Sequence, residues 1–431
     1  MKRTNRFICG DALAELRNMP AGSIDMCLTS PPYWGLRDYG IEQIFGGDKD
    51  CEHEWGECNK SSQRLRDPKT SVPELSNPKM GDICLKCQAW KGQLGLEPTP
   101  EFYIEHLTEI FNEVKRVLKR EGTLWLNIGD TYGGSSGGYY PHENELGASK
   151  SNIKFKGINK PKCLLMIPER LAIALIEGIE NPFNLIGGGW ILRNKIIWHK
   201  PNAMPSSVTD RFSNRWEYLF MFSKSQRYYF DLDGVREPYT EPMNRWGGDN
   251  LVAKGKSTWD KGTGQETYRD RNMRPNPDGK NPGDVFEINT QPFPEAHFAV
   301  FPEKLCEKPI KAGCPKQICK KCGKTRERIT EKGEFIQTGG KKKKEYTALS
   351  ESQKNIAAGF HPSVTIGFTS CKCNADFEPG IVLDPFAGAG TVGVVAKSLG
   401  RRFILIDIKK EYMKMAKKRV AQVGHQKELF E

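Results

Sequence analysis

The stretch that decides the fold is GIVLDPFAGAGTVGVVAKSLGRRFILIDI, residues 380–408. It opens with an apolar run, passes through Gly388, Gly390 and Gly393, continues with helical spacing and ends in a second apolar run closed by Asp407. A strand, a glycine-rich turn, a helix and a second strand ending in an acid are typical of the βαβ unit of a parallel sheet. We therefore expect an α/β protein built from such units.

The glycine turn also predicts a nucleotide cofactor. Glycines let the backbone approach the ligand, and a carboxylate after the next strand accepts hydrogen bonds from ribose hydroxyls. The motif alone fits either a dinucleotide or S-adenosylmethionine. An acid at Asp384, before the glycines, suits the methionine ammonium group and favours S-adenosylmethionine. The cofactor-binding residues predicted from this stretch are Asp384, Phe386, Gly388, Gly390, Thr391 and Asp407.

The rest of the chain continues the alternation of strands and helices. Apolar runs of strand length occur at 6–9, 24–29, 122–130, 189–201 and 215–225. Segments with helical spacing lie between them, at 10–23, 98–120 and 167–178. The last two apolar runs predict an antiparallel hairpin that finishes the sheet. The pattern as a whole indicates three layers, with helices on both faces of a largely parallel sheet.

A second motif, TSPPYW at residues 29–34, ends the strand predicted at 24–29. Pro31 and Pro32 fix two φ angles and remove two backbone donors, so the carbonyl groups of this turn are held rigidly. A surface turn with buried aromatics is the simpler interpretation of the stretch alone. A rigid turn at a carboxyl edge of the sheet is also where a parallel sheet binds its ligands.

The two motifs together give a resemblance to a known family. TSPPYW followed later by DPFAGAGT (384–391) resembles the β class of amino-group DNA methyltransferases, in which the catalytic half precedes the cofactor half. GDALAEL (10–16) resembles the family's segment for the cofactor adenine, which implies a role for Asp11. The resemblance spans most of the chain. It implies a three-layer Rossmann-like fold, S-adenosylmethionine as cofactor and double-stranded DNA as partner.

The resemblance also implies what the proline turn does. An exocyclic amine is a poor nucleophile, and two acceptors on its hydrogens would localise the lone pair and aim it at the methyl group. Ser30 Oγ and the Pro31 carbonyl are the expected acceptors. Tyr33 would stack on a base extruded from the duplex, and Trp34 would widen this platform or simply pack. The predicted catalytic residues are Ser30, Pro31, Pro32 and Tyr33.

The target atom is less clearly specified. In this family a serine at the first position of the tetrapeptide is associated with N4 of cytosine, and the alternative is N6 of adenine. Two further alternatives are an RNA or protein methyltransferase that uses a similar turn, and a zinc-containing DNA-binding protein without catalysis.

The charge favours a polyanionic partner. The formal net charge is +12 and the pI is near 9.0, which fits nucleic acid better than a membrane surface. We see no secretory signal or membrane span and expect a soluble, cytoplasmic protein. A restriction endonuclease is a possible partner, and the oligomeric state stays open. The predicted contacts to the target base or DNA are Trp34, Trp198, Lys200, Arg245 and Arg269.

Thirteen cysteines in a reducing compartment suggest metal binding rather than disulfides. Their spacing gives two sets of four zinc ligands: Cys51, His53, Cys84 and Cys87 in one, and Cys319, Cys322, Cys371 and Cys373 in the other. Cys58 and Cys314 are competing ligands, and thiols without metal are the alternative. Complete sets of four leave no open position, so one or two zinc ions would be structural.

These features divide the chain into a core with inserts. We expect zinc-ribbon-like inserts at 49–97 and 314–378, and a target-recognition insert at 236–284, which is rich in Gly, Pro, Asn, Arg and Lys. The expected core segments are 1–48 with the catalytic turn, 98–235, 285–313 and the cofactor half at 379–431.

Overall fold

The computed structural model describes residues 5–48, 50–56, 82–133, 162–180, 185–239, 276, 278–291, 301–334, 336–339 and 358–424. The chain divides into two compact units. The first consists of Met1–Tyr229, Asp284–Cys314 and Gly380–Glu431, and the second of Phe230–Gly283 and Pro315–Pro379. Most of the segments 236–284 and 314–378 thus belongs to the second unit, whereas 49–97 belongs to the first.

The first unit is built on an eight-stranded sheet. Its strands, in spatial order, are β1 (Arg6–Cys9), β20 (Arg402–Asp407), β19 (Ile381–Asp384), β2 (Ile24–Thr29), β7 (Leu118–Ile128), β11 (Trp216–Ser223), β10 (Ile191–His199) and β12 (Val285–Glu287). Only β11 runs against its neighbours. The largely parallel sheet is as predicted, and so is the antiparallel pair β10 and β11. That pair does not finish the sheet, because β12 adds in parallel beyond β10.

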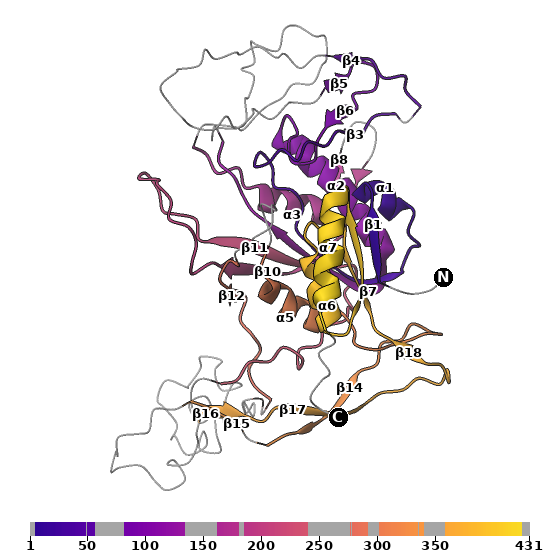
Figure 1. Ribbon diagram of the computed structural model, residues 1–431, viewed down its shortest axis with the longest axis vertical. Coiled ribbons are helices and arrows are strands. Elements are labelled where there is room, and N and C mark those ends of the chain that lie inside the picture. The colour runs from indigo at the N-terminus through magenta and orange to yellow at the C-terminus, as the bar shows by residue number, and fades with distance from the viewer. Residues whose placement is uncertain are drawn as a thin grey trace, which may run out of the picture. The chain divides into compact units, whose positions relative to one another are not determined.

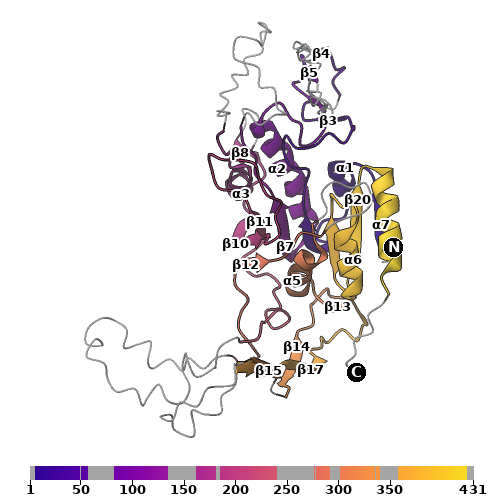
Figure 2. The same cartoon turned by 60° about the vertical axis from the view of Figure 1, so that its left-hand side comes forward.

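Helices cover both faces of this sheet. One face carries α1 (Ala12–Arg17), α2 (Pro100–Val117) and α3 (Ile167–Glu177), and the other carries α5 (Glu303–Gly313), α6 (Thr391–Ser398) and α7 (Lys410–Gln422). Figure 1 shows α6 and α7 in front of the strands, and in Figure 2 they lie across the sheet from α2 and α3. Successive strand residues serve opposite cores, as with Cys27 and Leu28. The fold is the expected three-layer α/β fold.

Helix α2 illustrates how the sequence builds a layer. Thr99 caps it by accepting a hydrogen bond from the Phe102 N–H at 3.4 Å, and Pro100 occupies the first turn. Tyr103, Leu107, Phe111 and Val114, which repeat at helical spacing, are fully buried. Burying a large apolar side chain of this kind contributes about 1.5–3 kcal/mol to the stability of the fold, relative to leaving it exposed. The helix ends at Val117, three residues before the predicted limit, because β7 begins at once.

The topology places a ligand site between β2 and β19. The chain leaves β2 toward β7 on one side, and it leaves β19 toward β20 on the other. Adjacent parallel strands whose connections diverge in this way open a crevice at their carboxyl ends. The two strand ends are tied together there, since Thr29 Oγ1 donates to Asp384 Oδ1 at 2.7 Å.

Smaller sheets complete the two units. The first unit has the four-stranded sheet β3 (Gln43–Phe45), β6 (Trp90–Gly92), β5 (Asp82–Cys84) and β4 (Trp55–Gly56), and the pair β8 (Ile179–Glu180) and β9 (Leu185–Ile186). The described part of the second unit contains three two-stranded ribbons: β13 (Ile318–Cys319) with β18 (Phe377–Glu378), β14 (Arg328–Lys332) with β17 (Ser363–Phe368), and β15 (Ile336–Gly339) with β16 (Ala358–Phe360). Across the described ranges, no helix combines the length and the apolar character needed to cross a membrane.

Candidate functional site

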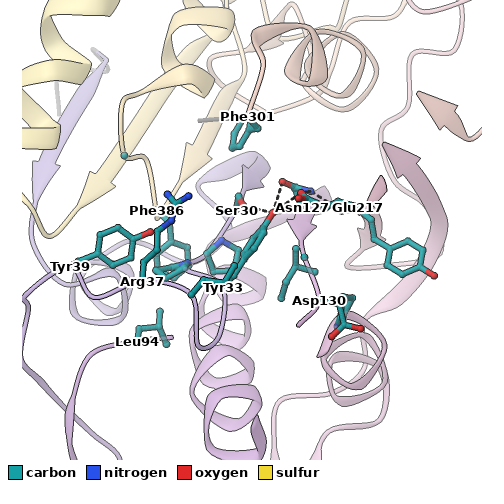
Figure 3. A pocket seen from close by; sticks show the side chains of 18 of the residues that line it. Ser30, Tyr33, Arg37, Tyr39, Leu94, Asn127, Asp130, Glu217, Phe301 and Phe386 are labelled. Carbon is teal, nitrogen blue, oxygen red and sulfur yellow. Dashed lines mark hydrogen bonds between the residues drawn. The ribbon is translucent and has the colours of Figure 1, made fainter. Parts of the chain in front are cut away.

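A cavity of about 1170 Å³ lies at the carboxyl edge of the large sheet. Single-ligand pockets usually measure about 300–1,000 Å³, so this one has room for more than one small ligand. Figure 3 shows its two ends: Tyr39 and Phe386 lie on one side of Ser30 and Tyr33, and Glu217 lies on the other. The proline turn therefore stands between the two ends of the cavity.

The glycine loop forms one end. Gly390 starts α6 with φ of +77°, and a Cβ atom there would lie 2.6 Å from the Ala416 Cβ atom, so only glycine fits. The Asp407 carboxylate at the end of β20 accepts hydrogen bonds from the N–H groups of Gly388 and Lys409, each at 2.8 Å. Burial raises the pKa of Asp407. The acid and the loop thus fix each other at the cavity wall.

Asp384 lies behind this wall. It is 1% exposed, and its Oδ1 accepts the Thr29 hydroxyl and, at 3.1 Å, the N–H of Phe386. Burial raises its pKa to about 7, although the Thr29 hydrogen bond opposes the shift. A carboxyl group with this pKa changes its charge near neutral pH, and it lies where the glycine loop meets the end of β2.

The predicted cofactor residues divide into two groups. Asp11, Phe386, Gly388 and Asp407 line the cavity, whereas Asp384, Gly390 and Thr391 lie behind it and shape the loop. Asp11 caps α1 by accepting the Ala14 N–H at 2.7 Å, and its other oxygen accepts the side-chain amide of Gln43. Gln43 also lines the cavity, and nothing in the sequence marked it.

Hydrogen bonds to neighbouring segments hold the proline turn in place. The Tyr103 hydroxyl donates to the Pro32 carbonyl at 2.6 Å, and the Gly35 N–H donates to the Gly95 carbonyl at 2.8 Å. Gly95 has φ of +92°, and an added Cβ would lie 3.2 Å from Pro32. Within the described ranges no donor reaches the Pro31 carbonyl. Pro31 is buried and lines the cavity, while the carbonyl of its neighbour Pro32 anchors the turn.

Tyr33 is fixed at both ends of its ring. Its hydroxyl lies 2.9 Å from Glu217 Oε2 and 3.1 Å from Asn127 Oδ1, and it is 3.5 Å from Ser30 Oγ. Burial, followed by the charge of Glu217, raises the pKa of Tyr33 well above its usual value. The ring lies against Gly129, where a Cβ would come within 2.5 Å of Cε2. Glycine at this position is what lets the ring lie flat at the end of β7.

The residues predicted to contact the target base need one correction. Trp34 is 6% exposed, its indole N–H donates to the Glu97 carbonyl at 3.0 Å, and it packs in the core beneath the turn. It is therefore a packing residue and not part of a platform. Trp198 is also buried, at 4% exposed, and its indole N–H donates to the Ile288 carbonyl at 2.8 Å, but unlike Trp34 it belongs to the cavity lining. Lys200 also lines the cavity, but its ammonium group is paired with Glu217 and lies 4.3 Å from the Trp198 ring centre.

Two predicted residues lie outside the described part of the chain, and three residues that line the cavity were not predicted from the sequence. Arg245 and Arg269 fall outside the described residues. Asn127 and Asp130 line the cavity, and their place at the end of a predicted strand could have marked them. Glu217 gave no such signal, because it begins an antiparallel strand whose start, unlike its end, reaches this edge.

Both cysteine sets come together in space. In each, the four ligand atoms lie within 4.8 Å of one another: Cys51, His53, Cys84 and Cys87 in the first unit, and Cys319, Cys322, Cys371 and Cys373 in the second. Of the competing ligands, Cys314 is buried in the core of the first unit, and Cys58 lies outside the described residues. The donor sets, three thiols with an imidazole and four thiols, suit zinc.

Comparison with known proteins identifies the family. A family model described as DNA methylase, N6_N4_Mtase, matches residues 24–320 and 374–418. Type II methyltransferase M.XycI of Xanthomonas campestris pv. cyanopsidis is 31% identical over 414 residues, which cover 95% of this chain and 86% of that protein. Type II methyltransferase M.SmaI of Serratia marcescens is 29% identical over 423 residues, which cover 97% of this chain and 91% of that protein.

Among solved structures, the PvuII DNA methyltransferase (cytosine-N4-specific) matches with a TM-score of 0.45 and 14% identity, covering 97% of this chain and 89% of that one. The assignment rests on the sequence matches, which extend from the proline turn through the cofactor loop. The chain belongs to the N6/N4 family of DNA methylases, the S-adenosylmethionine-dependent DNA amino-methyltransferases.

Proposed function

We propose that the enzyme methylates N4 of a cytosine extruded from duplex DNA, with N6 of adenine as the second candidate. The observation that carries the proposal is the place of Ser30 between the two ends of the cavity (Figure 3), with the next residue, Pro31, also in the cavity lining. Two acceptors there can hold both hydrogens of an exocyclic amine. The choice of cytosine rests on the serine itself, which the family associates with N4 targets.

The roles of the two acceptors follow from the chemistry of the amine. Its lone pair is delocalised into the base ring, and hydrogen bonds to both amine hydrogens favour a pyramidal nitrogen with a directed lone pair. As the new nitrogen–carbon bond forms, the carbon–sulfur bond of the sulfonium breaks, its electron pair stays on the sulfur, and the methylated nitrogen then releases one proton to water. Ser30 and Pro31 orient the nitrogen for this displacement, and Pro32 keeps the turn rigid.

Tyr33 and Trp198 are the proposed contacts of the extruded base. The Tyr33 ring is fixed by Gly129 beneath it and by Glu217 and Asn127 at its hydroxyl. A fixed aromatic ring loses little entropy when a base stacks on it, which suits base recognition. Lys200 holds Glu217 in place in the absence of DNA.

We further propose that the enzyme works as the modification partner of a restriction endonuclease, because the relatives named above are Type II methyltransferases. Arg245 and Arg269 remain proposed DNA contacts, since they belong to the expected target-recognition segment 236–284 between the two motifs.

The test is to identify the methylated base. Purified enzyme is incubated with mixed-sequence duplex DNA and methyl-labelled S-adenosylmethionine, and the DNA is digested to nucleosides for mass spectrometry. Labelled N4-methylcytosine supports the proposal. Labelled N6-methyladenine would keep the mechanism and overturn the base assignment. Ser30→Ala, with cofactor binding retained, is the control that ties the label to the proline turn.

A further inference from the structure

The first cysteine cluster lies next to the cavity rather than apart from it. Strand β3 enters the small sheet between the proline turn and the cluster, and its residues Gln43 and Phe45 line the cavity. Its partner β6 follows directly after the turn that carries Cys84 and Cys87. We infer that Cys51, His53, Cys84 and Cys87 bind one structural zinc ion that holds the wall of the cofactor end of the cavity.

The ligand distances fit a tetrahedral ion. Cys51 Sγ lies 4.0 Å from Cys84 Sγ, and Cys87 Sγ lies 3.3 Å from His53 Nδ1. With Zn–S near 2.3 Å and Zn–N near 2.0–2.1 Å, tetrahedral geometry requires about 3.8 Å between two sulfurs and about 3.6 Å between sulfur and nitrogen. With three thiols and one imidazole the set is complete, so the ion would have no open position for water or substrate.

The turn that carries Cys84 and Cys87 is shaped for a metal. The Cys84 N–H donates to the Ala89 carbonyl at 2.7 Å, and the Gln88 N–H donates to the Cys84 carbonyl at 3.0 Å. These bonds close the turn, and the sulfurs of Cys84 and Cys87 lie within 4.8 Å of the other two ligand atoms.

The second unit repeats this turn with a different sequence. The Cys319 N–H donates to the Lys324 carbonyl at 2.9 Å, and the Gly323 N–H donates to the Cys319 carbonyl at 2.9 Å. The residue after the second cysteine is left-handed in both turns, with φ of +61° at Gln88 and +72° at Gly323. Glutamine rarely adopts this conformation. Its use at Gln88 indicates that the four ligands impose the turn.

Short contacts connect the cluster to the cavity wall. A Cβ at Gly47, two residues after Phe45, would lie 2.8 Å from Cys87 Sγ, so the segment that follows β3 packs directly on the cluster. Phe45 stacks on Trp90 of β6 at 5.4 Å and on His106 of α2 at 4.6 Å. Strands β3 and β6 thus pack against the cysteine cluster on one side and against the core on the other.

Two side chains connect strands β3 and β6 to residues that line the cavity. Gln43, at the start of β3, donates to the Asp11 carboxylate. Gln93, directly after β6, accepts the Tyr39 N–H and donates to the Arg37 carbonyl at 2.8 Å. Asp11, Arg37 and Tyr39 all line the cavity. Without the ion, four donor groups would have to separate or pair with water, and β3 and β6 would lose their outer anchor.

The test measures zinc and cofactor binding separately on the full chain. Zinc is counted by mass spectrometry of the purified protein, and S-adenosylmethionine affinity is measured by calorimetry. We expect two zinc ions per chain, one for each cluster. Cys84→Ser should leave one zinc ion and weaken S-adenosylmethionine binding about tenfold, through loss of order in the cavity wall, which corresponds to about 1.4 kcal/mol. The matched control Cys371→Ser should also leave one zinc ion but keep the affinity.

Two variants separate the possible failures, because the effect on affinity rests on the assignment of the Asp407 end of the cavity to the cofactor. Gln43→Ala should keep both zinc ions and weaken cofactor binding. If Asp407→Asn and Gln43→Ala both leave the affinity unchanged, that assignment fails while the zinc count stands. Full zinc in Cys84→Ser, or equal affinity in Cys84→Ser and Cys371→Ser, overturns the proposal. If Cys84→Ser does not fold, chelation of the Cys371→Ser protein, which holds only the first zinc ion, followed by zinc replacement gives the same comparison.

Discussion

The cofactor loop (384–391) and the proline turn (30–34) follow neighbouring parallel strands, yet they are built differently. The loop is held mainly by a local contact, because Asp407 lies only 19 residues from Gly388 along the chain, and Asp384 adds one distant contact to Thr29, 355 residues away. The proline turn depends on distant segments, because Tyr103 and Glu217 reach it from 71 and 184 residues away. The difference teaches that a binding loop can be encoded in one stretch, whereas a catalytic turn needs the folded core to position it.

The largest expected effect distinguishes the role of the proline turn from that of the cofactor loop, and it comes from removing the proposed acceptor Ser30 in the turn. Ser30→Ala should lower kcat by about 10²–10³, the usual loss for one oriented transition-state hydrogen bond. The cofactor loop is untouched, so S-adenosylmethionine affinity should not change. Single-turnover kinetics with calorimetry measure both quantities. Ser207→Ala, an exposed serine elsewhere on the first unit, is the control. A parallel loss of cofactor affinity would mean that the two halves are not separable.

The converse change addresses the cofactor loop. Asp407→Asn removes a charge that accepts two backbone hydrogen bonds and lines the cavity. We expect about a 30-fold weaker affinity for S-adenosylmethionine, the value of about 2 kcal/mol for a hydrogen bond to a charged group. At saturating cofactor the kcat should stay within about twofold of wild type. A large loss of kcat under saturation would place Asp407 in the chemical step.

This contrast also explains what the sequence could and could not predict. The βαβ unit and its acid were predictable, because each part lies at a fixed spacing in one stretch. Trp34 was misplaced, since sequence alone does not tell that the turn buries this ring against the Glu97 carbonyl. Glu217 was missed because its place depends on the register of β11 against β7, which pairs Tyr218 with Ile128. Such register is a property of the assembled sheet.

The affinity for S-adenosylmethionine should depend on pH through Asp384, which joins the cofactor loop to the strand before the proline turn. In the cofactor-free protein, burial raises the pKa of Asp384 to about 7, so the carboxylate is about nine-tenths ionised at pH 8 and about one-tenth at pH 6. A cationic cofactor favours the ionised form, so its affinity should fall about tenfold as the pH drops from 8 to 6. Calorimetry across this range measures the effect, and Asp384→Asn should flatten it. A slope that persists in Asp384→Asn would assign the titration to another group.

The smallest expected effect tests whether the distant scaffold really positions the turn. In Gly129→Ala the new Cβ would lie 2.5 Å from the Tyr33 ring, so the ring must move. We expect kcat to fall about fivefold, from about 1 kcal/mol of misplacement, with cofactor affinity unchanged. If the effect acts through the ring, Gly129→Ala added to Tyr33→Ala should cause no further loss, because two changes that act through one contact are not additive. Rate measurements on the single and double variants decide the point. A full additional fivefold loss in the double variant would mean that Gly129 serves the site independently of Tyr33. The contact between Gly129 and the Tyr33 ring would then not be what positions the proline turn.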